Sequence, residues 1–255
     1  FIKSLKIRGM RTVKTLINKE LKITFNSILI YIALIVFFGV TGFICWFSWS
    51  NIFSIGLVPL SYLFNIFYWA LFFLIPFLTM KSIAEERKVG TYELLLSKPI
   101  TTWQIIWGKF CAILLQVVLC LVLTLSYYIT LAYLGHIDHA VGICGYIGLI
   151  LVSSCYISIG MFASSLTSNP LFAFFISIGV GLCFQKLFEW IAELFGTGLL
   201  TNIFHYLAMG EHFDSFSRGI IDTKDIIYFF SIIILFLNLT KYVMNKSRIQ
   251  PKKNN

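Results

Sequence analysis

Charged residues are scarce in this sequence and absent from most of its length. Asp, Glu, Lys and Arg make up 12% of the 255 residues, whereas 58% are hydrophobic. Soluble domains carry about 25% charged residues. A chain of this size therefore has too little polar surface for an ordinary soluble fold, and the composition favours a protein that crosses a membrane several times.

Three long runs contain no Asp, Glu, Lys or Arg: residues 23–80, 110–137 and 141–185. Such continuous runs favour helices over a membrane barrel, whose strands alternate apolar and polar residues over about 10 positions. We predict an all-α polytopic membrane protein, because about 20 apolar residues are enough to cross the bilayer. Six transmembrane helices are expected, at about 28–49, 62–80, 107–134, 141–163, 171–188 and 226–244.

Several motifs that would capture energy or perform chemistry are missing. Gly108-Lys109 is followed by Phe110 and lacks the upstream glycine of a phosphate-binding P-loop. The zinc-protease pattern HExxH is absent, and in the EExxxR pattern of intramembrane proteases the arginine position is occupied by Gly90. The spans hold almost no ionisable residue, which disfavours a proton-driven transporter. We expect the energy for any work to come from a separate subunit.

The six cysteines and two polar groups each allow a functional and a structural interpretation. No cysteine pair forms CxxC, so free thiols packed among apolar residues are expected. His136, Asp138 and His139 could bind a metal, but their position in a turn favours exposed loop residues. Glu211, His212 and Asp214 could act as a general acid and base or contact a ligand, and a structural polar network is the favoured interpretation of this group.

The positive charge divides between the two sides of the predicted bundle. Seventeen of the twenty Lys and Arg residues fall in the N-terminal stretch, the 81–109 loop or the C-terminal tail. This asymmetry places both termini in the cytoplasm and explains the net charge of +9 without a nucleic-acid partner. Residues 1–26 are expected to form an amphipathic helix on the anionic membrane surface, although a flank that only orients the first span is also compatible.

Residues 81–109 form the longest polar island in the chain. Arg87 and Lys88 followed by Gly90 predict a helix end at Val89. A short helix is expected at 92–98, and Thr101 with Gln104 predicts a capping box that starts the third span. At the opposite side, residues 189–225 are expected to form short surface or re-entrant helices.

Two segments resemble a known family. The stretch KSIAEERKVGTYELLLSKPITTWQIIWGKF is similar to the cytoplasmic loop of ABC-2 type permeases, above all of the gliding-motility branch, with the nitrous-oxide reductase accessory permeases related. The segment EHFDSFSRGIIDTKDIIYFFSI resembles the stretch before the last span of the same branch. With the spacing of the spans, the resemblance covers about residues 20–245.

The resemblance implies a single permease domain, residues 1–255, in a bacterial inner membrane. It would pair with an identical or related membrane subunit and bind cytoplasmic ATPase subunits. ATP and Mg²⁺ would be held by that ATPase, with no cofactor on this chain and no enzymatic activity of its own. A coupling helix in the 81–109 loop would contact the ATPase through six residues: Glu85, Glu86, Arg87, Gly90, Thr91 and Glu93.

Two other functions stay open at this point. One is a membrane scaffold or force-transmitting subunit that moves no substrate, which the gliding-motility resemblance brings in. The other is a membrane enzyme that uses an extracytoplasmic polar cluster of Glu211, His212, Asp214 and Arg218. The substrate of a permease is left open by the sequence.

Overall fold

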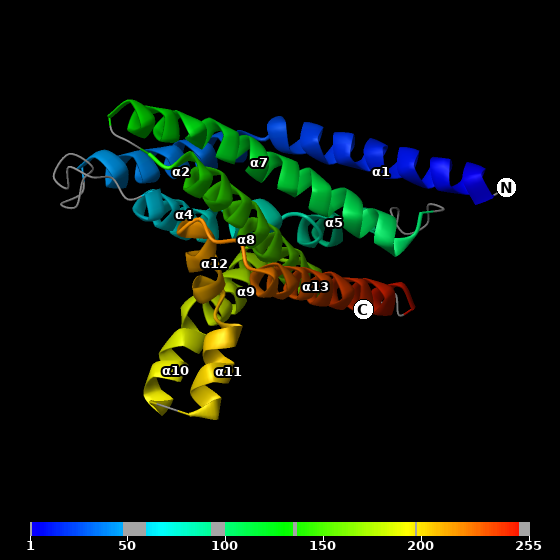
Figure 1. The fold of residues 1–255 in the computed structure, drawn as a ribbon. Coiled ribbons are helices and arrows are strands. Elements are labelled where there is room, and N and C mark those ends of the chain that lie inside the picture. The colour runs from blue at the N-terminus through cyan, green and yellow to red at the C-terminus, as the bar shows by residue number, and fades with distance from the viewer. Residues whose placement is uncertain (1, 48–59, 93–99, 135–136, 197, 250–255) are drawn as a thin grey trace.

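The computed structural model describes residues 2–47, 60–92, 100–134, 137–196 and 198–249, which form helices joined by short turns (Figure 1). This arrangement confirms the predicted all-α fold. In chain order the helices are α1 (Ile2–Phe25), α2 (Ile28–Phe47), α4 (Leu60–Thr79), α5 (Ala84–Val89), α7 (Thr102–Leu134), α8 (His139–Leu166), α9 (Pro170–Leu182), the π-helix η1 (Cys183–Leu187), α10 (Phe188–Phe195), α11 (Leu199–Leu207), α12 (Met209–Ser217) and α13 (Thr223–Ile249).

Six stretches of the described residues are long and apolar enough to cross a membrane. They correspond one to one to the predicted spans, which confirms a six-span membrane protein. Their bounds are Ile28–Phe47, Leu60–Val89, Thr102–Tyr133, His139–Leu166, Pro170–Phe195 and Thr223–Lys246.

Helix α8 lies at the centre of the bundle and packs against α4, α7, α9, α12 and α13 (Figure 1). Small residues let its neighbours approach closely: a Cβ added at Gly148 would lie 2.6 Å from the Cβ of Phe216. Ser153 and Ser158 are fully buried and donate their hydroxyls to carbonyls of α8 itself. Small residues at helix contacts are typical of membrane bundles, because they permit extensive van der Waals packing between backbones.

The turns on either side of α8 have clear local causes. Asp138 caps its start by accepting from the Ala140 N–H at 2.9 Å. The predicted spans at 141–163 and 171–188 leave residues 164–170 as the connection between them. The observed connection is shorter, because α8 continues to Leu166. Asn169 then accepts from the Leu171 N–H at 3.0 Å, and Pro170 occupies the first turn of α9, where its missing N–H costs nothing.

The fifth span is longer than predicted. Helix α9 continues through the π-helical turn η1 into α10 and ends only at Gly196, whose φ is +68°. A span end near 188 was expected because the charged residues begin there, but Lys186 and Glu189 pair with each other at 2.6 Å along the helix. The short helices expected within 189–225 are present as α11 and α12, and their location at a membrane surface stays a prediction.

Helix α1 runs beside α7 (Figure 1). Leu16 is its most buried described side chain and lies over Gly108, where a Cβ would be only 3.2 Å from the Leu16 Cβ. Lys19 and Lys22 are exposed, as predicted for the polar face. Helix α7 has 33 residues and is about 50 Å long, which exceeds the bilayer core of about 30 Å. Part of α7 can therefore receive α1 beyond the hydrocarbon core.

Candidate functional site

The second span ends at Val89, as predicted, but it contains a turn and is not one unbroken helix. Helix α4 ends at Thr79, and a turn at residues 80–83 separates it from α5. Pro76 lies inside the last turns of α4 and lacks the N–H that an uninterrupted helix would use. The second span therefore consists of two helices, α4 and α5, joined by the turn at residues 80–83.

Ser164 of α8 forms hydrogen bonds with this turn and with the start of α5. Its buried hydroxyl accepts from the backbone N–H groups of Ile83 and Ala84 and donates to the carbonyl of Met80, each at 3.0 Å. The first N–H groups of a helix have no partner within that helix. A side chain from a helix about 80 residues away thus caps α5 and ties it to the centre of the bundle.

Helix α5 ends as predicted. Gly90 has a φ of +78°, the left-handed conformation of a helix C-cap, and Arg87 and Lys88 lie in the last turn. Glycine adopts this conformation without the steric cost that a Cβ would add. The predicted short helix at 92–98 lies outside the described residues except for Tyr92.

The predicted capping box at the start of α7 is confirmed. The Gln104 N–H donates to the Thr101 hydroxyl at 3.3 Å, and the Thr101 N–H donates to the Gln104 side-chain oxygen at 3.0 Å. These two bonds satisfy reciprocal backbone donors. They fix where α7 begins, and with it the position of the residues one and two turns further along.

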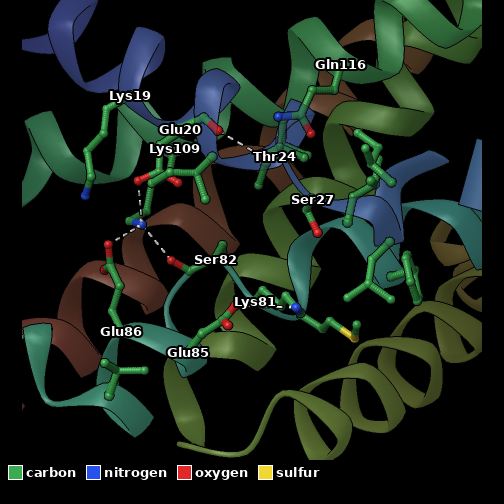
Figure 2. A pocket seen from close by; sticks show the side chains of 18 of the residues that line it. Lys19, Glu20, Thr24, Ser27, Lys81, Ser82, Glu85, Glu86, Lys109 and Gln116 are labelled. Atoms are coloured by element: carbon green, nitrogen blue, oxygen red, sulfur yellow. Dashed lines mark hydrogen bonds and ion pairs between the residues drawn. The ribbon is translucent and has the colours of Figure 1, made fainter. Parts of the chain in front are cut away.

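Lys109 of α7 is the central residue of the site and is only 2% exposed (Figure 2). Its ammonium donates to Glu20 of α1 at 3.1 Å, to Glu86 of α5 at 2.9 Å and to the carbonyl of Ser82 at 2.6 Å. An ammonium has three N–H donors, and all three are used. Because a buried charge is strongly unfavourable without partners, this full set of bonds is what allows Lys109 to be buried.

The residues Glu20, Glu86 and Lys109, here called the Lys109 triad, therefore join α1, α5 and α7. From the sequence, Lys109 is counted only among the basic residues of the 81–109 loop, and Glu20 is given no role. One signal was available: Glu20 is the only acid among the first 26 residues, and it falls on the same helical face as Leu16. A lone acid on a basic helix pointed to an internal partner.

A second set of contacts ties the same region to α13. The Tyr92 hydroxyl donates to the carbonyl of Met244 at 3.4 Å, and Arg87 lies 5.0 Å from the centre of the Tyr92 ring. Lys241 of α13 lies 4.9 Å from the ring centre of Trp103 in α7. Cations over aromatic faces are attracted by the ring quadrupole. The end of the second span thus contacts both the third and the sixth.

The six predicted coupling residues face different ways. Glu85, Gly90 and Thr91 are exposed, and Arg87 is half-buried. Glu86 instead turns inward to Lys109. Glu93 lies outside the described residues. An outside protein could therefore reach one side of α5 directly, while the other side is fixed to the helical bundle.

The predicted polar cluster at the opposite end of the bundle does not form one group. Glu211 pairs with His205 of α11 at 3.0 Å. Arg218 donates to the backbone carbonyl of Asp214 at 3.3 Å, as part of the end of α12. Partial burial raises the pKa of Asp214, and the nearby Arg218 cation opposes that shift. His212 is separate from all three.

His212 is buried between α11 and α13. Its Nδ1 lies 2.6 Å from Oδ1 of Asp225 and its Nε2 lies 3.1 Å from the carbonyl of Tyr206. Both partners offer oxygen acceptors, so both ring nitrogens are engaged within the protein. Tyr228 stacks on the ring with centroids 3.9 Å apart. This arrangement is a structural pair, and no free nitrogen remains for acid–base chemistry.

The other candidates have structural roles where the structure describes them. Asp138 caps α8, and His139 Nδ1 lies 2.8 Å from the Tyr128 hydroxyl, while His136 is outside the described residues. Among the described residues, no group of three or more His, Cys, Asp or Glu side chains is placed to hold a metal ion. All six cysteines are free thiols, and Cys45, Cys120 and Cys155 are buried.

Comparison with known proteins gives the family. A search of curated proteins returned no match. A family model described as "ABC-2 family transporter protein" matches residues 9–250 and so covers all six spans and both ends of the bundle. The chain belongs to the ABC-2 family of transporter membrane proteins.

Proposed function

We propose that this chain is the permease subunit of an ATP-driven export complex in a bacterial inner membrane, and that α5 and the residues after it receive the movement of a separate ATPase. ATP and Mg²⁺ would bind on that ATPase. A second membrane subunit, identical or related, would complete the transmembrane unit. Both termini and α5 would face the cytoplasm, as the distribution of Lys and Arg indicates.

The Lys109 triad is the observation that carries the proposal. One side of α5 exposes Glu85 and Lys88, whereas the other side is bonded through Glu86 to Lys109 and through Ser164 to α8. A push on the exposed side would therefore move α1, α7 and α8 together. Charged hydrogen bonds of this kind are short and strong, so they hold the three helices in a defined geometry.

We further propose that the chain falls in the gliding-motility branch of the family, with the nitrous-oxide reductase accessory permeases as relatives. The support is the sequence pattern of residues 211–232, which spans α12 and the first part of α13. The buried His212 and Asp225 pair lies within this pattern. The pattern thus coincides with a packed element of the fold.

A charge exchange on α5 tests the coupling role. Glu85→Lys combined with Lys88→Glu keeps the net charge and touches neither the Lys109 triad nor the Ser164 cap. We expect roughly a tenfold weaker association with the ATPase and a matching loss of stimulated ATP hydrolysis. The matched control is Asp222→Lys with Lys224→Asp, an exposed pair at the opposite end, which should leave both unchanged.

The readout also separates the alternative functions. Equal ATPase binding and hydrolysis in both charge-exchange variants would remove α5 from the coupling role. A complex that binds and hydrolyses ATP normally yet moves no material across reconstituted vesicles would favour the scaffold or force-transmitting subunit.

A further inference from the structure

A cavity of about 380 Å³ opens beside the Lys109 triad, between α1, α2, α4, α5 and α7 (Figure 2). Its wall is divided by chemistry. Polar side chains come mainly from α1, α5 and the turn before α5, including Lys19, Lys81 and Glu85. Apolar side chains come mainly from the start of α2 and the end of α4, including Ile30 and Phe77. A ligand that fits this cavity must be amphipathic.

Two buried polar atoms in the wall lack a hydrogen-bond partner among the described residues. They are the Ser82 hydroxyl oxygen and Oε2 of Glu86, whose other carboxylate oxygen is bonded to Lys109. Ser82 as a whole is only 9% exposed. An unsatisfied buried polar group costs about 1–3 kcal/mol, so a group that donates to the carboxylate and bonds to the hydroxyl would remove this cost.

The charges of the cavity show what that group must carry. Lys109 is shared by two carboxylates, Glu20 and Glu86, which leaves the triad with one excess negative charge. Lys81 and Glu85 lie 3.8 Å apart and balance each other. Lys19 stands exposed at the rim, with no ion-pair partner in the part of the chain described. The cavity therefore offers one uncompensated anion inside and one uncompensated cation at its edge.

We propose that the cavity binds the headgroup of a membrane phospholipid that carries a primary ammonium beside its phosphate. The ammonium would donate to Glu86 Oε2 and the Ser82 hydroxyl, and the phosphate would pair with Lys19. The acyl chains would follow Ile30 and Phe77 out of the cavity onto the lipid-facing side of α2, where Ile32 and Ile35 are 50% and 71% exposed.

Other common lipids fit this cavity less well. A quaternary choline headgroup has no N–H to donate to Glu86 or Ser82. A glycerol headgroup brings a phosphate but no cation for the excess negative charge of the triad. Free phosphoethanolamine lacks the chains that would cover the apolar wall. The site would sit in the leaflet nearest α1, and the inference does not depend on the ATPase coupling proposed above, because it uses only the cavity and its charges.

Such a lipid would be part of the contact between α1 and α5. Its ammonium would touch the same carboxylate that holds Lys109, and its phosphate would touch α1. Removing it would leave Glu86 with an unpaired oxygen and loosen the attachment of α1. The lipid composition of the membrane would thereby act on the same three helices that the triad joins.

Native mass spectrometry of the purified full-length chain tests the proposal. The protein would be titrated in detergent with dioleoyl phosphatidylethanolamine, phosphatidylcholine and phosphatidylglycerol in separate experiments. We expect the ethanolamine lipid to be retained at least about fivefold better than either of the others, a difference of about 1 kcal/mol. Equal retention of the three lipids, stronger retention of phosphatidylglycerol, or no retained lipid would overturn the proposal.

Variants locate the site. Ser82→Ala and Lys19→Ala remove side chains that make no described bond within the protein, so both should fold and both should reduce the preference for the ethanolamine lipid. Glu86→Gln should abolish it, and because the readout is a ratio between lipids in folded protein, lower stability does not obscure the result. Lys22→Ala is the matched control: it removes another exposed lysine of α1 that does not line the cavity. An unchanged preference in Ser82→Ala and Lys19→Ala would place any lipid elsewhere.

Discussion

Glu20 of α1 and Lys109 of α7 form an ion pair 3.1 Å long across 89 positions of sequence, and the lysine is almost fully buried. Lys109 uses all three of its N–H donors within the protein. It therefore cannot bind lipid headgroups as an ordinary interfacial lysine does. The N-terminal helix is therefore attached to the bundle by a specific bond, in addition to the contact between Leu16 and Gly108.

Replacing the triad cation should release α1. Lys109→Met leaves Glu20 and Glu86 without their shared partner, and breaking a buried pair from one side costs roughly 3–5 kcal/mol. We expect a large fall in melting temperature in detergent and faster trypsin cleavage after Lys19 and Lys22. Lys14→Met changes an exposed lysine of the same helix, leaves both cleavage sites in place and should do neither. Unchanged cleavage in Lys109→Met would show that α1 is held by apolar contacts alone.

Removing the Ser164 hydroxyl should loosen α5 without disturbing α8. Ser164→Ala leaves the N–H groups of Ile83 and Ala84 and the carbonyl of Met80 without this partner, at a cost of about 1–3 kcal/mol. Hydrogen exchange at residues 83–86 should accelerate by about tenfold or more. Ser165→Ala is the matched control, because that hydroxyl bonds only to its own helix at Phe162. Equal exchange in the two variants would argue against the cap.

The contact between α8 and α4 should not tolerate a methyl group at Gly160. A Cβ there would lie 2.7 Å from the Cβ of Thr79, a buried side chain already bonded to its own helix. Overpacking of this kind costs about 1–3 kcal/mol, so Gly160→Ala should lower the melting temperature. Gly39→Ala in α2 meets nothing within 4 Å and should be neutral or stabilising, since alanine favours helices over glycine. A melting temperature for Gly160→Ala at or above that of Gly39→Ala would contradict the packing described.

Asp214 should make stability depend on pH at the end of the bundle that holds α12. Its folded-state pKa is raised, mainly by partial burial, above the unfolded value of about 3.9. The folded state therefore favours the protonated form. Stability is highest below the unfolded pKa and falls as the pH rises through the raised folded pKa.

The Asn variant isolates this effect. Asp214→Asn cannot ionise, so its melting temperature should exceed that of the parent by a margin that grows from acid to neutral pH. Glu193→Gln is the control, because that carboxylate is exposed. A margin that is constant with pH would show that Asp214 is not the titrating group.

The spans and their caps could be predicted from sequence because their causes are local. Gly90 after two cations predicts a helix end, and Thr101 with Gln104 predicts a helix start, from side chains that act within three or four positions. The charge-free runs predict six spans for the same reason, because whether a segment can cross the bilayer depends on its own length and composition. These predictions do not depend on the tertiary contacts between helices.

The bonds of the site could not be predicted because they join distant positions. The sequence places Ser164 in the connection between two predicted spans. In the structure it caps a helix about 80 residues away. The cluster around Glu211 was inferred from closeness in sequence, yet His212 turns away from its neighbours to Asp225 and Tyr206. The direction in which each side chain leaves its helix decides which residues meet, and adjacent residues on a helix point to different sides.

The separation between Glu20 and Lys109 also bears on how the protein is made. Helix α1 leaves the ribosome long before α7, and during that interval Lys109 is not yet available to Glu20. The basic helix is then free to remain at the membrane surface, where its cations can orient the first span. The ion pair that docks α1 can form only after the third span has been inserted. Docking of the N-terminal helix therefore follows the insertion of half of the six spans.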